Sequence, residues 1–268
     1  MIATTLTLRF DPVQRIDMTG VLPETLSGRS SADIGGQLVR VGGNPVALGD
    51  LFSVTAGEGD VLVICSDSEH LDYLGKNMAA GTLRVEGPAG NYAGQGLHGG
   101  ELLIAGDAGD CAANGMNGGL LHIAGDAGDW LGAALIGERA GMGGGIVAVA
   151  GNAGDRLGDR MRRGLILVQG KAGEACAARL LAGTVVVAGG SKGAPGAGLR
   201  RGSLIVGCTP EIVPATYNDA GVVELAWLGL LRRHVERILP GVVPNTARVR
   251  RYAGDMAFGG KGEILVSA

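Results

Sequence analysis

The sequence has 268 residues, a formal net charge of −3 and 46% hydrophobic residues, with aromatic residues at only 3%. The charge gives no general reason to expect nucleic acid or an acidic membrane surface as a partner, and no apolar run reaches the roughly 18 residues of a membrane span. The 51 glycines lack the period of three that collagen requires. The first ten residues lack the basic and apolar regions of a signal peptide, so we expect a cytoplasmic protein.

Residues 1–58 are irregular and are expected to form an N-terminal capping segment. Residues 4–8 and 37–41 show the short apolar pattern of strands, and residues 46–54 (VALGDLFSV) form an apolar stretch that leads into the next region. A stack of repeats exposes backbone and core at its ends, so segments of this kind are expected to cover them.

Residues 59–207 contain a repeat of 19 residues. A glycine marks its first position: Gly81, Gly100, Gly119, Gly145, Gly164, Gly183 and Gly202. One interval, from Gly119 to Gly145, is 26 residues and corresponds to one repeat with seven additional residues. Gly59 precedes Gly81 by 22 residues and marks a looser first repeat. So short a period indicates a solenoid, in which each unit buries its apolar face against its neighbours. The additional residues, near 137–143, are expected to form an outward loop.

Within a repeat, positions 3 and 5 are always apolar, as in Leu83 and Val85, and a large apolar residue such as Met78 stands three residues before each new glycine. The alternation predicts a short strand. Glycines recur at positions 7 and 10, with a small residue such as Ala89 between them, and are expected at sharp corners. No helical period is present. The simplest closed solution is a β-helix whose coils lie roughly 4.8 Å apart.

Residues 208–268 are expected to form a C-terminal capping segment. Residues 222–239 carry apolar side chains along one face of a predicted helix, which Pro240 and Gly241 end. The final residues, GGKGEILVS, predict a last strand.

Three glycine motifs match known nucleotide-binding or hydrolase patterns only loosely. Residues 94–99 fit G-x-G-x-x-G, but they lie on the return path of a repeat and not between a strand and a helix. Residues 189–193 fit G-x-S-x-G, but Ser191 holds the small corner position. Residues 254–261 have the wrong spacing for a phosphate-binding loop. We therefore expect no catalytic residue in this chain.

The four cysteines, at positions 65, 111, 176 and 208, are widely spaced, and the four histidines form no zinc motif. We expect buried thiols and no metal site. Position 11 of the repeat is polar or acidic, and its side chains are expected to cap turns in water: Asn91, Asp110, Asp129, Asp155 and Glu174. Calcium binding is the alternative, although the nine-residue β-roll pattern that it requires is missing.

A basic strip is expected along one edge, because six arginines fall in the last four positions of three consecutive repeats: Arg160, Arg162, Arg163, Arg179, Arg200 and Arg201. It is a candidate site for an extended anionic ligand or an acidic partner. Apolar residues at outward positions predict a second surface, covered by the C-terminal helix, by another subunit, or by both: Leu103, Ile146, Leu165, Leu167, Val186 and Ile205.

The repeats GQGLHGGELLIAGDAGD, NGMNGGLLHIAGDAGD, ERAGMGGGIVAVAGNAGD and DRMRRGLILVQGKAGE resemble the GXGXG β-helix family. That family includes the C-terminal domain of glutamate synthase and the C subunit of formylmethanofuran dehydrogenase. The segments VALGDLFSV and RRYAGDMAFGGKGEILV favour the latter over glutamate synthase. The resemblance implies a right-handed parallel β-helix and a non-catalytic scaffold subunit with no bound cofactor.

Two kinds of complex fit this resemblance. The dehydrogenase of methanogenesis, an oxidoreductase, carries a molybdenum or tungsten pterin on another subunit. The bacterial formyltransferase/hydrolase complex, which the Ala, Gly and Arg usage favours, is expected to pass formyl from tetrahydromethanopterin to a methanofuran-like carrier and to release formate. Its partner subunits would resemble an amidohydrolase and a formyltransferase. A glutamate-synthase-like module or a stand-alone β-helix binding protein is the alternative.

Overall fold

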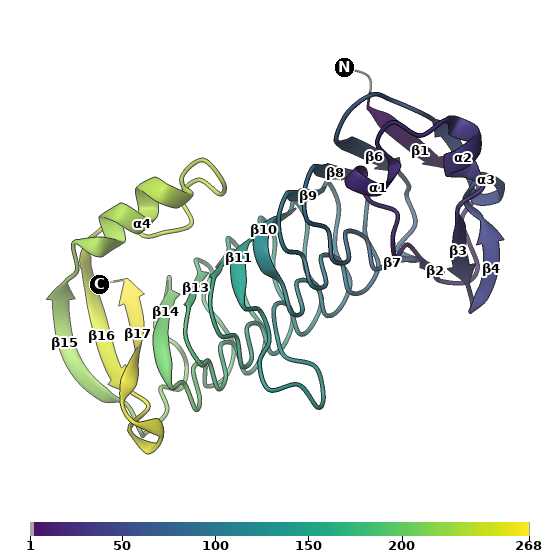
Figure 1. Cartoon of the computed structure of the whole chain (residues 1–268). Helices are drawn as coiled ribbons and strands as arrows, with labels where there is room; N and C mark the ends of the chain where they lie inside the picture. The colour runs from purple at the N-terminus through teal and green to yellow at the C-terminus, as the bar shows by residue number, and fades with distance from the viewer. Residues whose placement is uncertain (1–2, 268) are drawn as a thin grey trace.

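A computed structural model describes residues 3–267. The molecule is elongated, mainly β, and has few helices (Figure 1). Along the chain its elements are β1 (Thr4–Leu8), β2 (Ile16–Asp17), α1 (Pro23–Leu26), α2 (Ser31–Gly35), β3 (Leu38–Val41), β4 (Asn44–Ala47), α3 (Leu48–Leu51), β5 (Phe52–Thr55), β6 (Val61–Cys65), β7 (Leu71–Asp72), β8 (Thr82–Glu86), β9 (Glu101–Ile104), β10 (Asn117–Ile123), β11 (Gly144–Val149), β12 (Leu165–Val168), β13 (Thr184–Val187), β14 (Arg201–Val206), β15 (Asn218–Glu224), α4 (Trp227–Val235), β16 (Arg248–Gly254), the 3-10 turn η1 (Met256–Phe258) and β17 (Lys261–Ser267).

The repeats stack one upon the next in one large sheet. Its strand order is β15-β16-β17-β14-β13-β12-β11-β10-β9-β8-β6-β1-β5, and neighbours from β1 and β6 through β14 and β17 pair in parallel. Equivalent residues of successive repeats pair directly, as Leu102 does with Leu121 and Ile166 with Val185. Each repeat of the sequence therefore contributes one strand to the sheet. The long repeat keeps this register, because Leu120 before the additional residues pairs with Ile146 after them.

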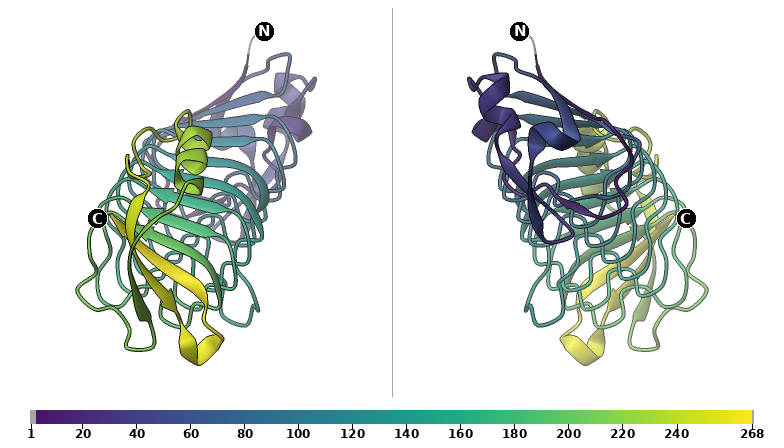
Figure 2. Two further views of the ribbon diagram at one scale, coloured as in Figure 1. Left: turned by 90° about the vertical axis from the view of Figure 1, so that its left-hand side faces the viewer. Right: turned by 90° about the vertical axis from the view of Figure 1, so that its right-hand side faces the viewer.

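A second line of pairing runs through the small residue between the two repeated glycines. Isolated parallel bridges join Ala89, Ala108, Ala127, Ala153, Ala172 and Ser191 in that order. A third line of backbone hydrogen bonds crosses the return segments, for example from Ala113 N to Ala93 O at 2.8 Å. Each repeat is thus bonded to the next at three places, and two further views show the repeats lying one behind the next (Figure 2).

The main core lies inside the stack and consists of the residues that the repeat predicts. Positions 3 and 5, as in Leu121 and Ile123, are fully buried, and so are the methionines and leucines that precede each new glycine. Burying such side chains stabilises the fold by about 1.5–3 kcal/mol each. Because they fill the interior in columns, the aliphatic composition and the low aromatic content suit this narrow core.

The glycines at positions 7 and 10 are required by close approach, and among them only Gly87 also has a positive φ, of +138°. A Cβ on Gly125 would lie 2.0 Å from Asp107 Oδ1 of the preceding repeat. Glycines at position 1 combine both reasons: Gly202 has φ +105°, and a Cβ there would lie 2.3 Å from Gly183 O. The repeats therefore approach each other closely at these corners.

Less regular segments lie at both ends of the stack. At the N-terminal end, β1 and β5 extend the large sheet, and a small sheet of order β4-β3-β2-β7 lies beside it. At the C-terminal end, β17 joins β14 in parallel, and β16 and β15 continue the sheet in antiparallel fashion. The predicted strands at 4–8, 37–41 and in the final segment are present.

The predicted helix over 222–239 is wrong at both ends. Residues 218–224 form strand β15, paired with β16, and the helix α4 covers only Trp227–Val235. Its apolar side is placed as expected, because Leu228, Val235 and Leu239 are buried. The strand forms because β16, distant in the sequence, supplies its hydrogen-bond partners.

Candidate functional site

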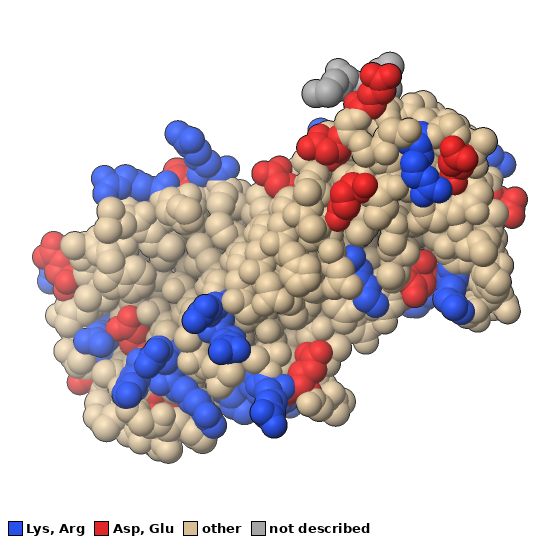
Figure 3. Space-filling model, viewed as in Figure 1, with Lys and Arg blue, Asp and Glu red and all other residues tan. Residues whose placement is uncertain are grey.

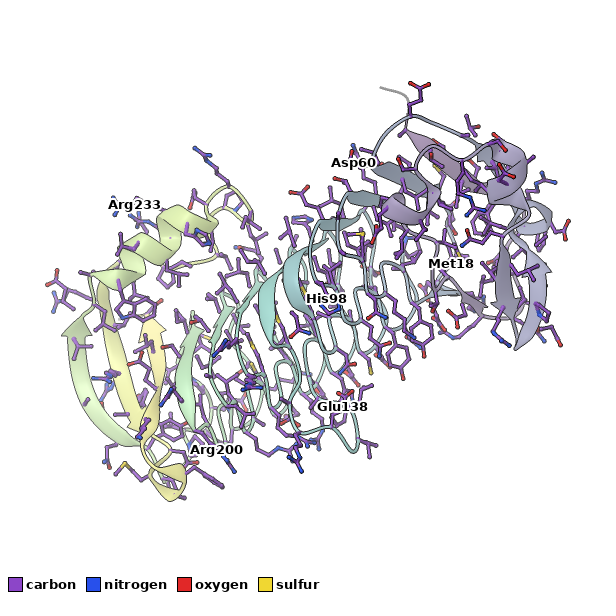
Figure 4. The ribbon with its side chains drawn as sticks, viewed as in Figure 1. Met18, Asp60, His98, Glu138, Arg200 and Arg233 are labelled. Carbon is purple, nitrogen blue, oxygen red and sulfur yellow. The ribbon has the colours of Figure 1, made fainter. Side chains whose placement is uncertain are left out.

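The arginines of the predicted strip divide into two groups. Arg162, Arg163, Arg200 and Arg201 are exposed at the starts of β12 and β14, and within residues 3–267 none of them forms an ion pair. The charge view shows basic side chains gathered on this face, and Arg200 projects from its edge (Figures 3 and 4). These four residues form the accessible part of the strip.

Arg179 is bound to a carboxylate inside the protein. Its Nε donates to Asp159 Oδ1 at 2.9 Å, its Nη2 contacts Asp159 Oδ2, and Arg156 Nη1 lies 3.6 Å from the same oxygen. Asp159 is fully buried, and the hydrogen bond to it raises the pKa of Arg179. A buried carboxylate requires such a partner. Nothing in the repeat pattern indicates that this arginine has a structural role.

Arg160 helps to hold the loop formed by the additional residues of the long repeat. Its Nη1 donates to Glu138 O at 2.8 Å. The Glu138 carboxylate accepts hydrogen bonds from Leu135 N at 2.9 Å and from buried Asn114 Nδ2 at 2.8 Å. The loop projects outward as predicted, with Glu138 at its base (Figures 1 and 4). It is thus fastened to the stack by hydrogen bonds on both sides.

The polar column at position 11 joins the repeats to one another. Asn91 Oδ1 accepts from Asp110 N at 2.9 Å, Asp110 Oδ1 from Asp129 N at 2.8 Å, and Asp129 Oδ1 from Asp155 N at 2.7 Å. The side chains were predicted to cap turns, and in the structure each of them accepts from the backbone of the next repeat. One oxygen of each carboxylate is already used in this way.

A second column of the same kind was not predicted from the sequence. At position 8, Asp107 Oδ1 accepts from Asp126 N at 2.7 Å, and Asp126 Oδ1 accepts from Asn152 N at 2.6 Å. The signal was present in the recurring letters GDAGD, whose first acidic residue repeats as regularly as its second. Two polar ladders therefore run along the stack, one on each side of the alanine column.

A group of aromatic side chains in and next to position 12 was not predicted either. The rings of Tyr73 and Tyr92 stack with centroids 4.9 Å apart, Lys76 Nζ lies 4.2 Å from the Tyr73 ring centroid, and Arg156 lies 4.8 Å from that of Trp130. Next to it is an open pocket of about 340 Å³, lined by Tyr92, Cys111, Trp130, Leu135 and Ile136. Stacking arises because equivalent residues of neighbouring repeats lie one strand spacing apart.

The predicted apolar surface is largely covered by the chain itself. Leu167, Val186 and Ile205 are buried against α4 and the residues that follow it, and they form a second apolar core. Leu165 is also buried, Ile146 is partly buried beside them, and Leu103 lies outside this core. A partner can therefore reach only the N-terminal part of this surface, because the C-terminal segment folds back over the rest.

The prediction of buried thiols holds only for Cys176, whose pKa burial raises to about 12. Cys65 and Cys111 are half-buried, and Cys208 is exposed. Burial lowers the pKa of His122. Across residues 3–267 no group of three or more His, Cys, Asp or Glu side chains is arranged to hold a metal ion. Gly94–Gly99 lie in a turn and the irregular backbone after it, and they open no helix.

None of the helices between residues 3 and 267 combines the length and the apolar character needed to cross a membrane.

Comparison with known proteins identifies one curated relative of part of the chain and one solved structure that covers nearly all of it. No family model matches it. A curated protein, the C subunit of the formyltransferase/hydrolase complex Fhc of Methylorubrum extorquens, is 40% identical over 87 residues, which are 32% of this chain and 33% of that protein. The aligned segment thus spans about a third of the relative's length. A polypeptide in the crystal structure of the formyltransferase/hydrolase complex (FhcABCD) from Methylorubrum extorquens in complex with methylofuran is 39% identical, with a TM-score of 0.91, over 98% of this chain and 99% of that one.

Proposed function

Because the chain belongs to the family of the C subunit of the formyltransferase/hydrolase complex, we propose that it is a non-catalytic structural subunit of such a complex. The observation that carries this proposal is the 39% identity to a polypeptide of that complex over nearly the full length of both chains. Likeness of this extent covers the capping segments as well as the repeats. It therefore supports a shared function, whereas a shared repeat motif alone would support only a shared fold.

We propose further that residues 59–207 form a right-handed parallel β-helix of 19-residue coils, and that residues 1–58 and 208–268 cap its two ends. The parallel pairing of β6 through β14 supports this architecture. The alanine bridges and the bonds between return segments add support, because they join the same pairs of repeats at two further places. A rod held together at three places is well suited to keep bound subunits at a fixed separation.

The polar side chains of the repeats support a structural role. Asp110 and Asp129 cap neighbouring repeats, and Asp159 is paired with Arg179, so these carboxylates already serve the fold. A catalytic carboxylate or base needs to reach a substrate proton. We therefore assign the chemistry of the complex to its other subunits.

On this proposal the partners are an amidohydrolase-like subunit and a formyltransferase subunit. The complex uses tetrahydromethanopterin and a methanofuran-like carrier, and any metal is held on another subunit. The related complex was crystallised with methylofuran, which supports a carrier of this type. The exposed arginines at 162, 163, 200 and 201 form an edge for an acidic partner or an extended anionic ligand, and Leu103 marks the apolar surface that a partner can reach.

The test is purification of the complex through an affinity tag on this chain, followed by native mass spectrometry and assays of formyl transfer and formate release. We expect co-purification with an amidohydrolase-like and a formyltransferase-like subunit, and no activity from the isolated chain. A monomeric chain that co-purifies with neither subunit would refute the scaffold assignment. Activity in the isolated chain would refute its non-catalytic part.

A further inference from the structure

A hairpin at the C-terminal end of the molecule displays two large apolar side chains. The turn η1 joins β16 to β17 and projects beyond the edge of the sheet (Figure 1). Met256 is 56% exposed and Phe258 is 49% exposed. Water is a poor environment for side chains of this size, and aromatic and methionine residues are enriched where proteins meet.

The hairpin is held firmly in place. Asp255, which is 4% exposed, accepts hydrogen bonds from Gly198 N at 3.1 Å and from Ala257 N at 3.0 Å. Met256 N donates to Thr216 O at 2.9 Å. Two segments outside the turn, at Gly198 and Thr216, thus fix its backbone, so the two exposed side chains project from a defined position.

Positive charge lies directly beside this hairpin. Arg201 pairs with Lys261 between β14 and β17. Leu165, Thr184 and Ser203 occupy the same register position in β12, β13 and β14, so Arg163, two residues before Leu165, lies at the register position of Arg201. The nearby carboxylate of Glu263 is already engaged, since it accepts from Ser203 Oγ at 2.7 Å and pairs with Arg251 at 2.8 Å.

No ion pair in the described part of the chain neutralises Arg163, Arg201 or Lys261. Strand spacing places Arg163 and Lys261 roughly 14 Å apart, three strands along the sheet. The basic side chains on this face are seen together in Figure 3. The column and the hairpin are therefore one continuous surface with uncompensated positive charge and two apolar side chains.

We propose that Met256, Phe258 and the column of Arg163, Arg201 and Lys261 form a docking surface for a partner subunit with an acidic face that contains an apolar recess. An extended anion would use the charges alone and would leave both apolar side chains in water. A protein surface uses both features, with the apolar residues as anchors and the charges as guides. This inference rests on the proposed function, and it selects the acidic partner over the anionic ligand for this part of the basic edge.

The test uses the complete complex purified through a tag on this chain. One variant is Met256→Ser/Phe258→Ser, and a second is Arg201→Glu/Lys261→Glu. The apolar control is Val13→Ser/Ile136→Ser, which changes side chains that are 96% and 95% exposed elsewhere, and the charge control is Arg139→Glu on the loop. Dissociation on dilution is measured by mass photometry, and thermal melting of each isolated chain verifies that it folds.

We expect both docking variants to weaken subunit association by on the order of tenfold or more, as is usual when interface anchors are removed. Both controls should assemble like the natural chain. Association of the charge variant should also depend less on salt, because screening acts on the charges that it removes. Unchanged association of the hairpin variant would overturn the inference, and so would loss of the carrier from the charge variant without loss of a subunit.

These outcomes are distinguishable from failure of the proposed function. If the natural chain co-purifies with no partner subunit, the scaffold assignment itself fails. If the natural chain assembles and the hairpin variant assembles equally well, only the docking surface is refuted.

Discussion

Replacement of Gly202 by alanine should be far more destabilising than the same replacement at Gly137. Both glycines have positive φ, +105° and +91°, so alanine at either site costs about 1 kcal/mol or somewhat more in backbone strain. At Gly137 nothing lies within 4 Å of the added Cβ. At Gly202 the Cβ would lie 2.3 Å from Gly183 O, in the backbone of the preceding repeat.

The additional destabilisation at Gly202 can be worked out from this contact. The two repeats must separate locally by about 1 Å to restore van der Waals contact. That movement breaks the 3.1 Å hydrogen bond from Ser203 N to Gly183 O and strains the next one between β13 and β14. At about 1 kcal/mol for each hydrogen bond, the total for Gly202→Ala is about 3 kcal/mol, against about 1 kcal/mol for Gly137→Ala.

The assay is urea unfolding followed by circular dichroism, with hydrogen exchange recorded in parallel because stacked repeats can unfold in more than one step. Exchange should accelerate first in β13 and β14 of the Gly202→Ala chain. Equal losses of stability for the two variants would refute the reasoning, since the close approach of the repeats would then have no energetic weight.

The ladder, the buried ion pair and the half-buried histidine give three further predictions. Asp129→Ala removes the acceptor for Asp155 N and should cost about 1 kcal/mol in urea unfolding, whereas Asp129→Asn keeps an acceptor and should cost less. Arg179→Met leaves buried Asp159 without its main partner and should cost about 2 kcal/mol, most of which Asp159→Asn in the same chain should restore; a double-mutant cycle with no recovery would contradict the pairing. Because burial lowers the pKa of His122 in the folded state, the unfolded state binds the proton more readily, so the free energy of unfolding should fall as pH drops below about 6.5 and fall less steeply in His122→Gln; identical pH profiles would disprove this.

The features that depend on the repeat alone were predictable from the sequence. Leu121 and Ile123 are buried because an alternating pattern has two faces, and Met142 regains the register after the additional residues because its column is inside. The helix start was wrong because residues 218–224 gain their partners from β16, more than twenty residues later in the chain. The hydrophobic pattern within a segment does not reveal which distant strand will pair with it.

The candidate site was predicted in part, for a related reason. Spacing predicted that the arginines fall on one edge, but it could not show that Arg179 turns to Asp159 in the preceding repeat. Likewise, the polar residues at position 11 were recognised, whereas the direction of their hydrogen bonds depends on the distance between repeats. The hairpin of Met256 and Phe258 lies outside the repeat, so no period marked it.

The loop in the long repeat has a practical consequence. Its base is closed by the hydrogen bond from Met142 N to Gly132 O at 2.9 Å, and Gly132 N is itself bonded to Ala112 O at 2.8 Å. The stack therefore continues as though the additional residues were absent. A fluorescent label or peptide tag inserted at Gly137 would therefore occupy a fixed position midway along the molecule. Distances from this position to each neighbouring subunit could be measured in solution.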